Sequence, residues 1–137
     1  MAPGSIVASG FLGDDSRPLA DIIEADEEAF RALGLDFGLA AEGLGALLKE
    51  GEAGLGAELR HGKGLVLSSD EARGKAPCPW GDGLHHKGSV RIGLAGSADF
   101  LLVSELSLHL LREHHFCQGR GSPFRLEPSL VKRVLEA

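Results

Sequence analysis

The chain has 137 residues, of which 43% are hydrophobic, so it can form one domain, over residues 1–137, around a single core. Its formal net charge is −6 and it has no run of Lys and Arg, which disfavours nucleic acid as a partner because phosphate contacts dominate that affinity. No apolar run approaches the roughly 18 residues of a membrane span, and no signal peptide is recognisable. We therefore expect no membrane association and a cytoplasmic location.

Two helices are predicted in the first half, after a short apolar stretch over residues 5–12 that suits an edge strand or an arm. Apolar residues recur at helical spacing over residues 19–33, and Gly34 suits the end of that helix. Asp26 lies beside the apolar stripe and is expected to cap or pair with a group at a helix contact. A second helix over residues 36–50 contains several glycines, which permit close packing but cost about 1 kcal/mol each relative to Ala. Together they predict a helical hairpin.

The hydrophobic period changes in the middle of the chain. Residues 58–60 and 65–67 are short strand candidates, and the glycines at 62–64 mark a turn between them. Residues 89–95 alternate between apolar and other side chains, which predicts a half-buried antiparallel strand. The insertion over residues 70–88 shows no periodicity, and loops of that length in compact domains are usually functional or disordered.

The last third is predicted to be helical. Residues 98–116 show the strongest helical pattern, with Ser97 as a candidate N-cap, and a final short helix begins at Glu127-Pro128. The pattern as a whole predicts an α+β fold. We expect a small antiparallel sheet of two to four strands, packed against the N-terminal helical hairpin and a central long helix.

The residues with the most versatile chemistry are concentrated in two segments. Five of the six histidines, both cysteines and the single tryptophan lie within residues 78–86 and 109–117. Thiolate and imidazole are the groups that bind zinc-like metals and that act as nucleophiles or bases near neutral pH. Any chemistry is therefore expected where these two segments meet.

Helix geometry selects among the residues of the second segment. His114 continues the apolar stripe of the predicted helix, and Cys117 lies three residues further on the same side if the helix persists. His109 precedes His114 by five residues, which is about 140° around the axis and on the polar face. We therefore expect His109 to be a solvated surface histidine.

The first segment offers a thiol and two adjacent histidines. Pro77 and Pro79 hold the residues that precede them, Ala76 and Cys78, extended, and Trp80 is expected to pack this loop onto the body of the protein. Asp82 precedes a glycine, which favours a structural role in a turn. His85 and His86 precede a strand and so face opposite sides, which allows only one of them to point into a common site.

Three functional hypotheses follow from these residues. The first is a zinc-like metal site between the 78–86 loop and the end of the 98–116 helix, with two thiolates and two imidazoles as tetrahedral ligands. Its candidate ligands are Cys78, one of His85 and His86, His114 and Cys117. The second is a metal-free protein-interaction or homo-oligomerisation module that uses the helical hairpin. The third is a small hydrolase-like enzyme with Cys78 as nucleophile and a histidine as base.

Overall fold

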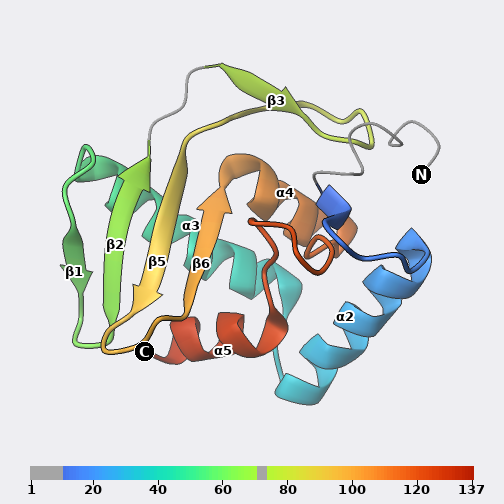
Figure 1. Ribbon diagram of the computed structural model, residues 1–137, viewed down its shortest axis with the longest axis horizontal. Helices are drawn as coiled ribbons and strands as arrows, with labels where there is room; N and C mark the ends of the chain where they lie inside the picture. The colour runs from blue at the N-terminus through green and yellow to red at the C-terminus, as the bar shows by residue number, and fades with distance from the viewer. Residues whose placement is uncertain (1–10, 71–73) are drawn as a thin grey trace.

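The computed structural model describes residues 11–70 and 74–137, so residues 5–10 of the predicted N-terminal stretch and residues 71–73 of the long insertion lie outside it. The described residues have the predicted α+β fold (Figure 1). Its elements are α2 (Leu19–Leu33), α3 (Phe37–Ala53), β1 (Leu59–His61), β2 (Leu65–Asp70), β3 (Lys75–Pro77), β4 (Leu84–His86), β5 (Ser89–Leu94), β6 (Phe100–Ser104), α4 (Glu105–His114) and α5 (Pro128–Glu136).

A four-stranded antiparallel sheet forms the centre of the fold, in the order β1-β2-β5-β6. Its register places Leu67 opposite Ile92 and Ile92 opposite Leu101, and all three side chains are buried. Because side chains alternate along a strand, these rows of apolar residues give the sheet one hydrophobic face. Helix α3 covers that face and lies behind the sheet in Figure 1.

The two N-terminal helices lie where the sequence predicts them. Gly34 ends α2 in the left-handed conformation, at φ 71°, and the Asp36 side chain caps α3 by accepting a hydrogen bond from the Leu39 amide at 2.8 Å. The rings of Phe30 and Phe37 stack across the connection, with their centroids 4.0 Å apart. This stack fixes the path of the chain between the two helices.

Gly43 of α3 permits close packing, as predicted, because a Cβ added there would lie 2.7 Å from the Leu135 side chain on α5. Gly51 lies beyond the predicted end of the helix, which continues to Ala53, and a Cβ there would lie 2.5 Å from Cγ1 of Val90 in the sheet. Both glycines therefore serve contacts within one chain. Homo-oligomerisation through this helix stays a prediction, which contacts within a single chain do not test.

The helix predicted over residues 98–116 is wrong in its first third, because that part is strand β6. Leu101 and Val103 alternate inward, and both pair with β5, so burial against α3 determines the local structure there. The helix begins only after Ser104. The Ser104 side chain accepts from the Ser107 amide and the Ser107 hydroxyl accepts from the Ser104 amide, which together form a capping box.

The long insertion contains regular structure that its sequence pattern does not reveal. Strands β3 and β4 pair in antiparallel fashion, with Ala76 opposite His85, and form a second sheet of two strands. This hairpin runs along the top of the molecule in Figure 1, and β4 contacts α4. A segment expected to be a loop is therefore a hairpin that lies over a helix.

Helix α5 packs against α2, and a buried ion pair lies beside this contact. Asp26 on α2 accepts hydrogen bonds from both terminal nitrogens of Arg125, each at 3.0 Å, which confirms the expected pairing of Asp26.

Within the described part of the chain, no helix combines the length and the apolar character that crossing a membrane requires.

Candidate metal centre

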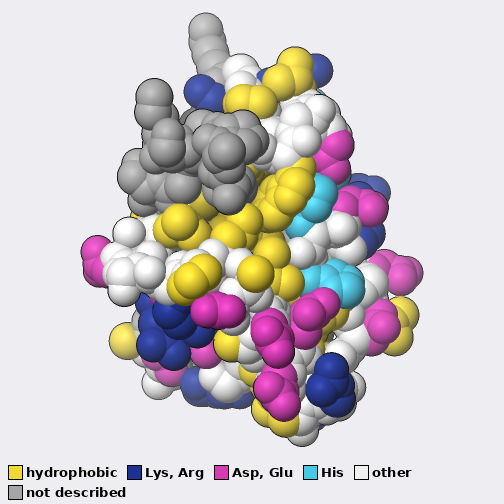
Figure 2. Space-filling model, turned by 90° about the vertical axis from the view of Figure 1, so that its right-hand side faces the viewer, with side chains coloured by type: hydrophobic (Ala, Val, Ile, Leu, Met, Phe, Trp, Pro, Cys, Tyr) yellow, Lys and Arg dark blue, Asp and Glu magenta, His cyan; other side chains and the backbone are white. Residues whose placement is uncertain are grey.

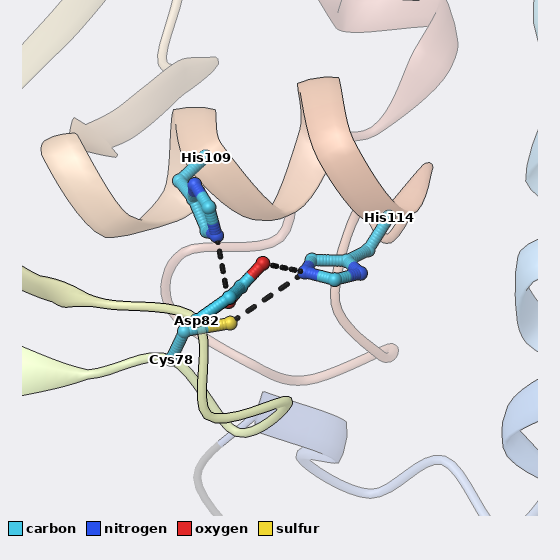
Figure 3. Close-up of side chains that lie close together, drawn as sticks. All are labelled: Cys78, Asp82, His109 and His114. Atoms are coloured by element: carbon cyan, nitrogen blue, oxygen red, sulfur yellow. Dashed lines mark hydrogen bonds and ion pairs between the residues drawn. The ribbon is translucent and has the colours of Figure 1, made fainter.

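Four potential metal ligands from the β3–β4 hairpin and helix α4 converge on one point. They are Cys78, Asp82, His109 and His114, and one donor atom from each lies within 4.8 Å of the others. Figure 3 shows the two histidines pointing from the helix toward the hairpin, where the thiol and the carboxylate meet them. Sequence segments about 30 residues apart are thus brought together at a single site.

The hairpin turn places the thiol and the carboxylate side by side. The Cys78 amide donates to the Gly83 carbonyl at 3.0 Å, and the Gly81 amide donates to the Cys78 carbonyl at 2.8 Å. Gly81 and Gly83 have φ angles of 80° and 136°, which side chains with a Cβ rarely adopt. Two glycines around Asp82 therefore fold the chain back so that this carboxylate returns to Cys78.

One carboxylate joins the two histidines of the helix. His109 Nε2 donates to Asp82 Oδ1 at 3.0 Å, and His114 Nε2 donates to Asp82 Oδ2 at 2.9 Å. Their positions on the helix differ by about 140° around the axis, and the two oxygens of Asp82 span the gap between their rings. The hairpin covers the face of α4 that the sequence predicts to be solvated, so the expectation of a surface role for His109 is wrong.

An aromatic stack holds His114 in place, and it confirms the predicted role of Trp80. The Trp80 and His114 rings lie nearly parallel, with centroids 4.1 Å apart, and Trp80 also contacts the buried Phe116 edge to face. This packing fixes the His114 ring plane and directs Nε2 toward the thiol. The distance from Cys78 Sγ to His114 Nε2 is 3.7 Å, so the two predicted residues do meet.

The electrostatics of the cluster favour a cation. Burial raises the pKa of the Cys78 thiol, and the neighbouring Asp82 carboxylate raises this pKa further. Hydrogen bonds from Cys78 and from the two histidines hold the pKa of Asp82 well below its usual range. A divalent ion at this point would reverse the effect on Cys78, because metal coordination deprotonates a thiol.

The geometry of the donors fits a small tetrahedral ion. Zinc bonds of about 2.0–2.3 Å separate neighbouring ligand atoms by roughly 3.3–3.8 Å. The sulfur-to-nitrogen distance of 3.7 Å lies in that range, and the nitrogen-to-oxygen distances of 2.9 and 3.0 Å need only a small opening. These three separations are therefore close to those of a zinc site, and all four donors lie within 4.8 Å of one another.

Cys117 lies apart from this group. Helix α4 ends at His114, and His115 adopts the left-handed conformation at φ 52°, so the three-residue helical spacing between His114 and Cys117 is not realised. Cys117 lies fully buried in the main core, where burial raises the pKa of its thiol. Its prediction as a ligand depended on a helix that continued for one more turn.

The two histidines of β4 face opposite ways, as strand alternation predicts. The His86 side chain is exposed, and its backbone amide approaches the Glu105 carboxylate at 3.4 Å. The His85 ring lies against the His109 ring, with centroids 4.3 Å apart, although its nitrogens are not in the group of four close donors. His85 is therefore the histidine of this pair that adjoins the cluster.

His115 belongs to a different surface. Its Nδ1 lies 2.7 Å from the Glu27 carboxylate on α2, and its ring stacks on Phe37 at 4.1 Å. Acidic side chains gather on the lower part of the face shown in Figure 2, and histidine and hydrophobic side chains lie above them. His115 thus contacts α2 instead of the candidate metal ligands.

The arrangement differs from that of a catalytic Cys–His–Asp set. In such a set the carboxylate orients the base through the ring nitrogen that does not face the nucleophile. Here Asp82 and Cys78 approach the same nitrogen, Nε2 of His114. The raised pKa of Cys78 also keeps its thiol protonated, so two observations argue against the nucleophile hypothesis.

Sequence reasoning missed Asp82 and His109. The signal for Asp82 is its position between two glycines four residues after Cys78, which marks a turn that folds back on the thiol. The burial of His109 depends on the hairpin above it and has no local signal.

Comparison with protein-family models, curated proteins and solved structures finds no match to this chain.

Proposed function

We propose that this chain binds one zinc-like divalent ion through Cys78, Asp82, His109 and His114, and that the ion fastens the β3–β4 hairpin to helix α4. The observation that carries the proposal is the convergence of both histidine Nε2 atoms and the Cys78 sulfur around one carboxylate. Sulfur, imidazole nitrogen and carboxylate oxygen are the donor types of zinc sites, and their closeness here supports the proposal.

The chemistry of the donors favours zinc over other common ions. Thiolate and imidazole are ligands of Zn²⁺, whereas Mg²⁺ and Ca²⁺ take oxygen ligands almost exclusively. Four protein ligands fill a tetrahedral shell, which is typical of structural zinc sites, while catalytic sites keep one position for water. We therefore assign the ion a structural role.

The β3–β4 hairpin depends for its stability on contacts with the rest of the protein. An isolated two-stranded hairpin is at best marginally stable, and this one forms a sheet of its own, separate from the central sheet. Its contacts at this end are the Trp80 stack, the polar cluster on α4 and the packing of Ala76 and Cys78 in a hydrophobic cluster. An ion bound by two hairpin residues and two helix residues would hold the turn of the hairpin against α4.

Zinc titration by calorimetry tests the proposal on protein freed of metal with a chelator. We expect one zinc per chain, with a stabilisation of about 2.7 kcal/mol when free zinc exceeds the dissociation constant a hundredfold. His109→Gln should abolish stoichiometric binding. His61→Gln is the matched control, because His61 pairs with Glu50 away from the cluster and should leave binding unchanged. The absence of stoichiometric zinc in the wild type would overturn the proposal.

A further inference from the structure

His85 has the environment of a metal ligand although it stands outside the group of four. Its side chain is 15% exposed, and its ring lies 4.3 Å from the ring of His109, centroid to centroid. His85 faces α4 because its neighbour His86 points to solvent from the other side of the strand. The strand therefore presents one imidazole to the edge of the cluster.

The two nitrogens of His85 differ in their surroundings. Nδ1 lies 3.6 Å from the Glu105 carboxylate at the start of α4. Nε2 is buried and has no hydrogen-bond partner. Among the described residues, no other buried side-chain nitrogen or oxygen lacks a partner in this way. A buried polar atom without a partner is costly, and its presence in a folded protein calls for an explanation such as an ion.

This pattern matches the way proteins prepare a histidine to bind a metal. A ligating histidine usually presents one nitrogen to the ion and directs the other to a carboxylate, which fixes the ring orientation and raises its basicity. Glu105 lies at an ion-pair distance of 3.6 Å from Nδ1, longer than a hydrogen bond, and Nε2 is the nitrogen left open. A Cβ placed on Gly83 would lie 3.3 Å from Nε2, so this nitrogen borders the turn that carries Asp82.

We infer that His85 is a fifth ligand of the proposed ion, joining through Nε2, and that Glu105 is the positioning residue that orients its ring. The inference rests on the proposed metal site. Zinc sites are most often four-coordinate, so the fifth ligand would expand the tetrahedral shell, as occurs in some zinc sites. Asp82, with 43% of its side chain exposed, is the most accessible of the donors and can move outward as Nε2 approaches.

A cleft beside the site gives the ion an access route. A hollow of about 690 Å³ lies against α3 and α4, and its lining includes His85, Glu105 and His109. His109 is thus the proposed ligand that borders this hollow, with His85 beside it. An ion that enters through this cleft would meet His85 beside His109, which supports a role for His85 in binding.

Histidine ring NMR tests the inference on the folded wild type, where no variant can confuse loss of a ligand with loss of folding. Protein with ¹⁵N-labelled histidine is titrated with zinc, and His86→Gln and His85→Gln assign the signals. We expect the Nε2 signal of His85 to shift with the same stoichiometry as those of His109 and His114. A His85 signal that stays unchanged while the other two shift would overturn the inference and leave the proposed four-ligand site intact.

Metal affinity provides the second measurement. His85→Gln and Glu105→Gln should each weaken zinc binding by about 10–100-fold, the usual cost of losing such a partner. His86→Gln, one residue along the same strand, should bind as the wild type does. With Co²⁺ as probe, His85→Gln should intensify the visible bands, since four-coordinate cobalt absorbs more strongly than five-coordinate cobalt. Equal affinities and equal spectra in the His85 and His86 variants would overturn the inference, whereas a wild type without zinc would overturn the proposed function itself.

Discussion

The buried ion pair between Asp26 and Arg125 predicts a large loss of stability when one of the two partners is removed. The side chains of Asp26 and Arg125 are only 5% and 11% exposed, and two hydrogen bonds of 3.0 Å join them. Asp26→Ala removes the acceptor and leaves a buried guanidinium with fewer partners. Breaking a buried pair in this way costs about 3–5 kcal/mol, because the remaining charge is uncompensated.

Arg125 keeps two other acceptors in the Asp26→Ala variant, so the expected loss of stability lies at the lower end of this range. Its guanidinium also donates to the Gln118 carbonyl at 2.6 Å and to the Glu127 carboxylate at 2.9 Å. We therefore expect Asp26→Ala to lower the free energy of unfolding by about 3 kcal/mol, or the melting temperature by roughly 10 °C. Urea unfolding at pH 7 measures this loss, and an unchanged denaturant slope shows that both proteins unfold in the same way.

A matched exposed pair serves as the control. Arg133 and Asp99 also lie 3.0 Å apart, but their side chains are 54% and 56% exposed. Asp99→Ala should therefore cost less than about 1 kcal/mol. Equal losses in Asp26→Ala and Asp99→Ala would refute the reasoning, because burial is the physical difference on which the predicted contrast depends.

Two further predictions concern the candidate metal centre. Cys78 and Cys117 are both buried with raised thiol pKa values, so a thiol reagent at pH 7 should modify the native protein slowly. In a Cys117→Ser background, zinc should slow the modification of Cys78 further. Modification of Cys78 at the rate of a free thiol would contradict its burial. The pKa of Asp82 is lower in the folded than in the unfolded state, so its contribution to stability is present above the unfolded-state value of about 4 and is lost as the pH falls below it. The urea midpoint of metal-free Asp82→Asn should consequently fall less steeply below pH 4 than that of the wild type, and identical slopes would show that Asp82 has no such role.

The sequence predicts well those elements whose patterns are local. Helix α2 follows from its apolar spacing and from Gly34, whose freedom to adopt a positive φ ends the helix. Strand β5 follows from its alternation, which matches its burial against α3. In both cases the residues that decide the structure lie within the element, so no knowledge of distant partners is needed.

The boundary between β6 and α4 could not be predicted in the same way. The apolar residues from Leu101 to Leu111 satisfy a helical period across the whole stretch. What makes the first part a strand is a partner, since β5 supplies the hydrogen bonds and α3 covers the inward side chains. A pattern that is compatible with two structures is decided by tertiary contacts, and these are not local.

The candidate site shows the same division. The Cys–His concentration indicates Cys78 and His114, which lie in short segments of unusual composition, and the structure brings these two side chains together. His109 was assigned to solvent from the polar face of its helix, and the reasoning failed because the hairpin packs on that face. A helical wheel describes one helix alone, so it cannot show which polar face another element covers.

The pairing of Cys78 with Asp82 gives the strongest physical reason to expect an ion. The neutral Cys78 thiol donates a hydrogen bond to the Asp82 carboxylate, and this carboxylate makes it harder for the thiol to lose its proton. Chains that place these groups together by means of two positive-φ glycines adopt a costly turn for that result. A divalent cation between them would attract both a Cys78 thiolate and the Asp82 carboxylate, and both histidine nitrogens could bind it. One ion would thus bind every donor that the Asp82 carboxylate already draws together.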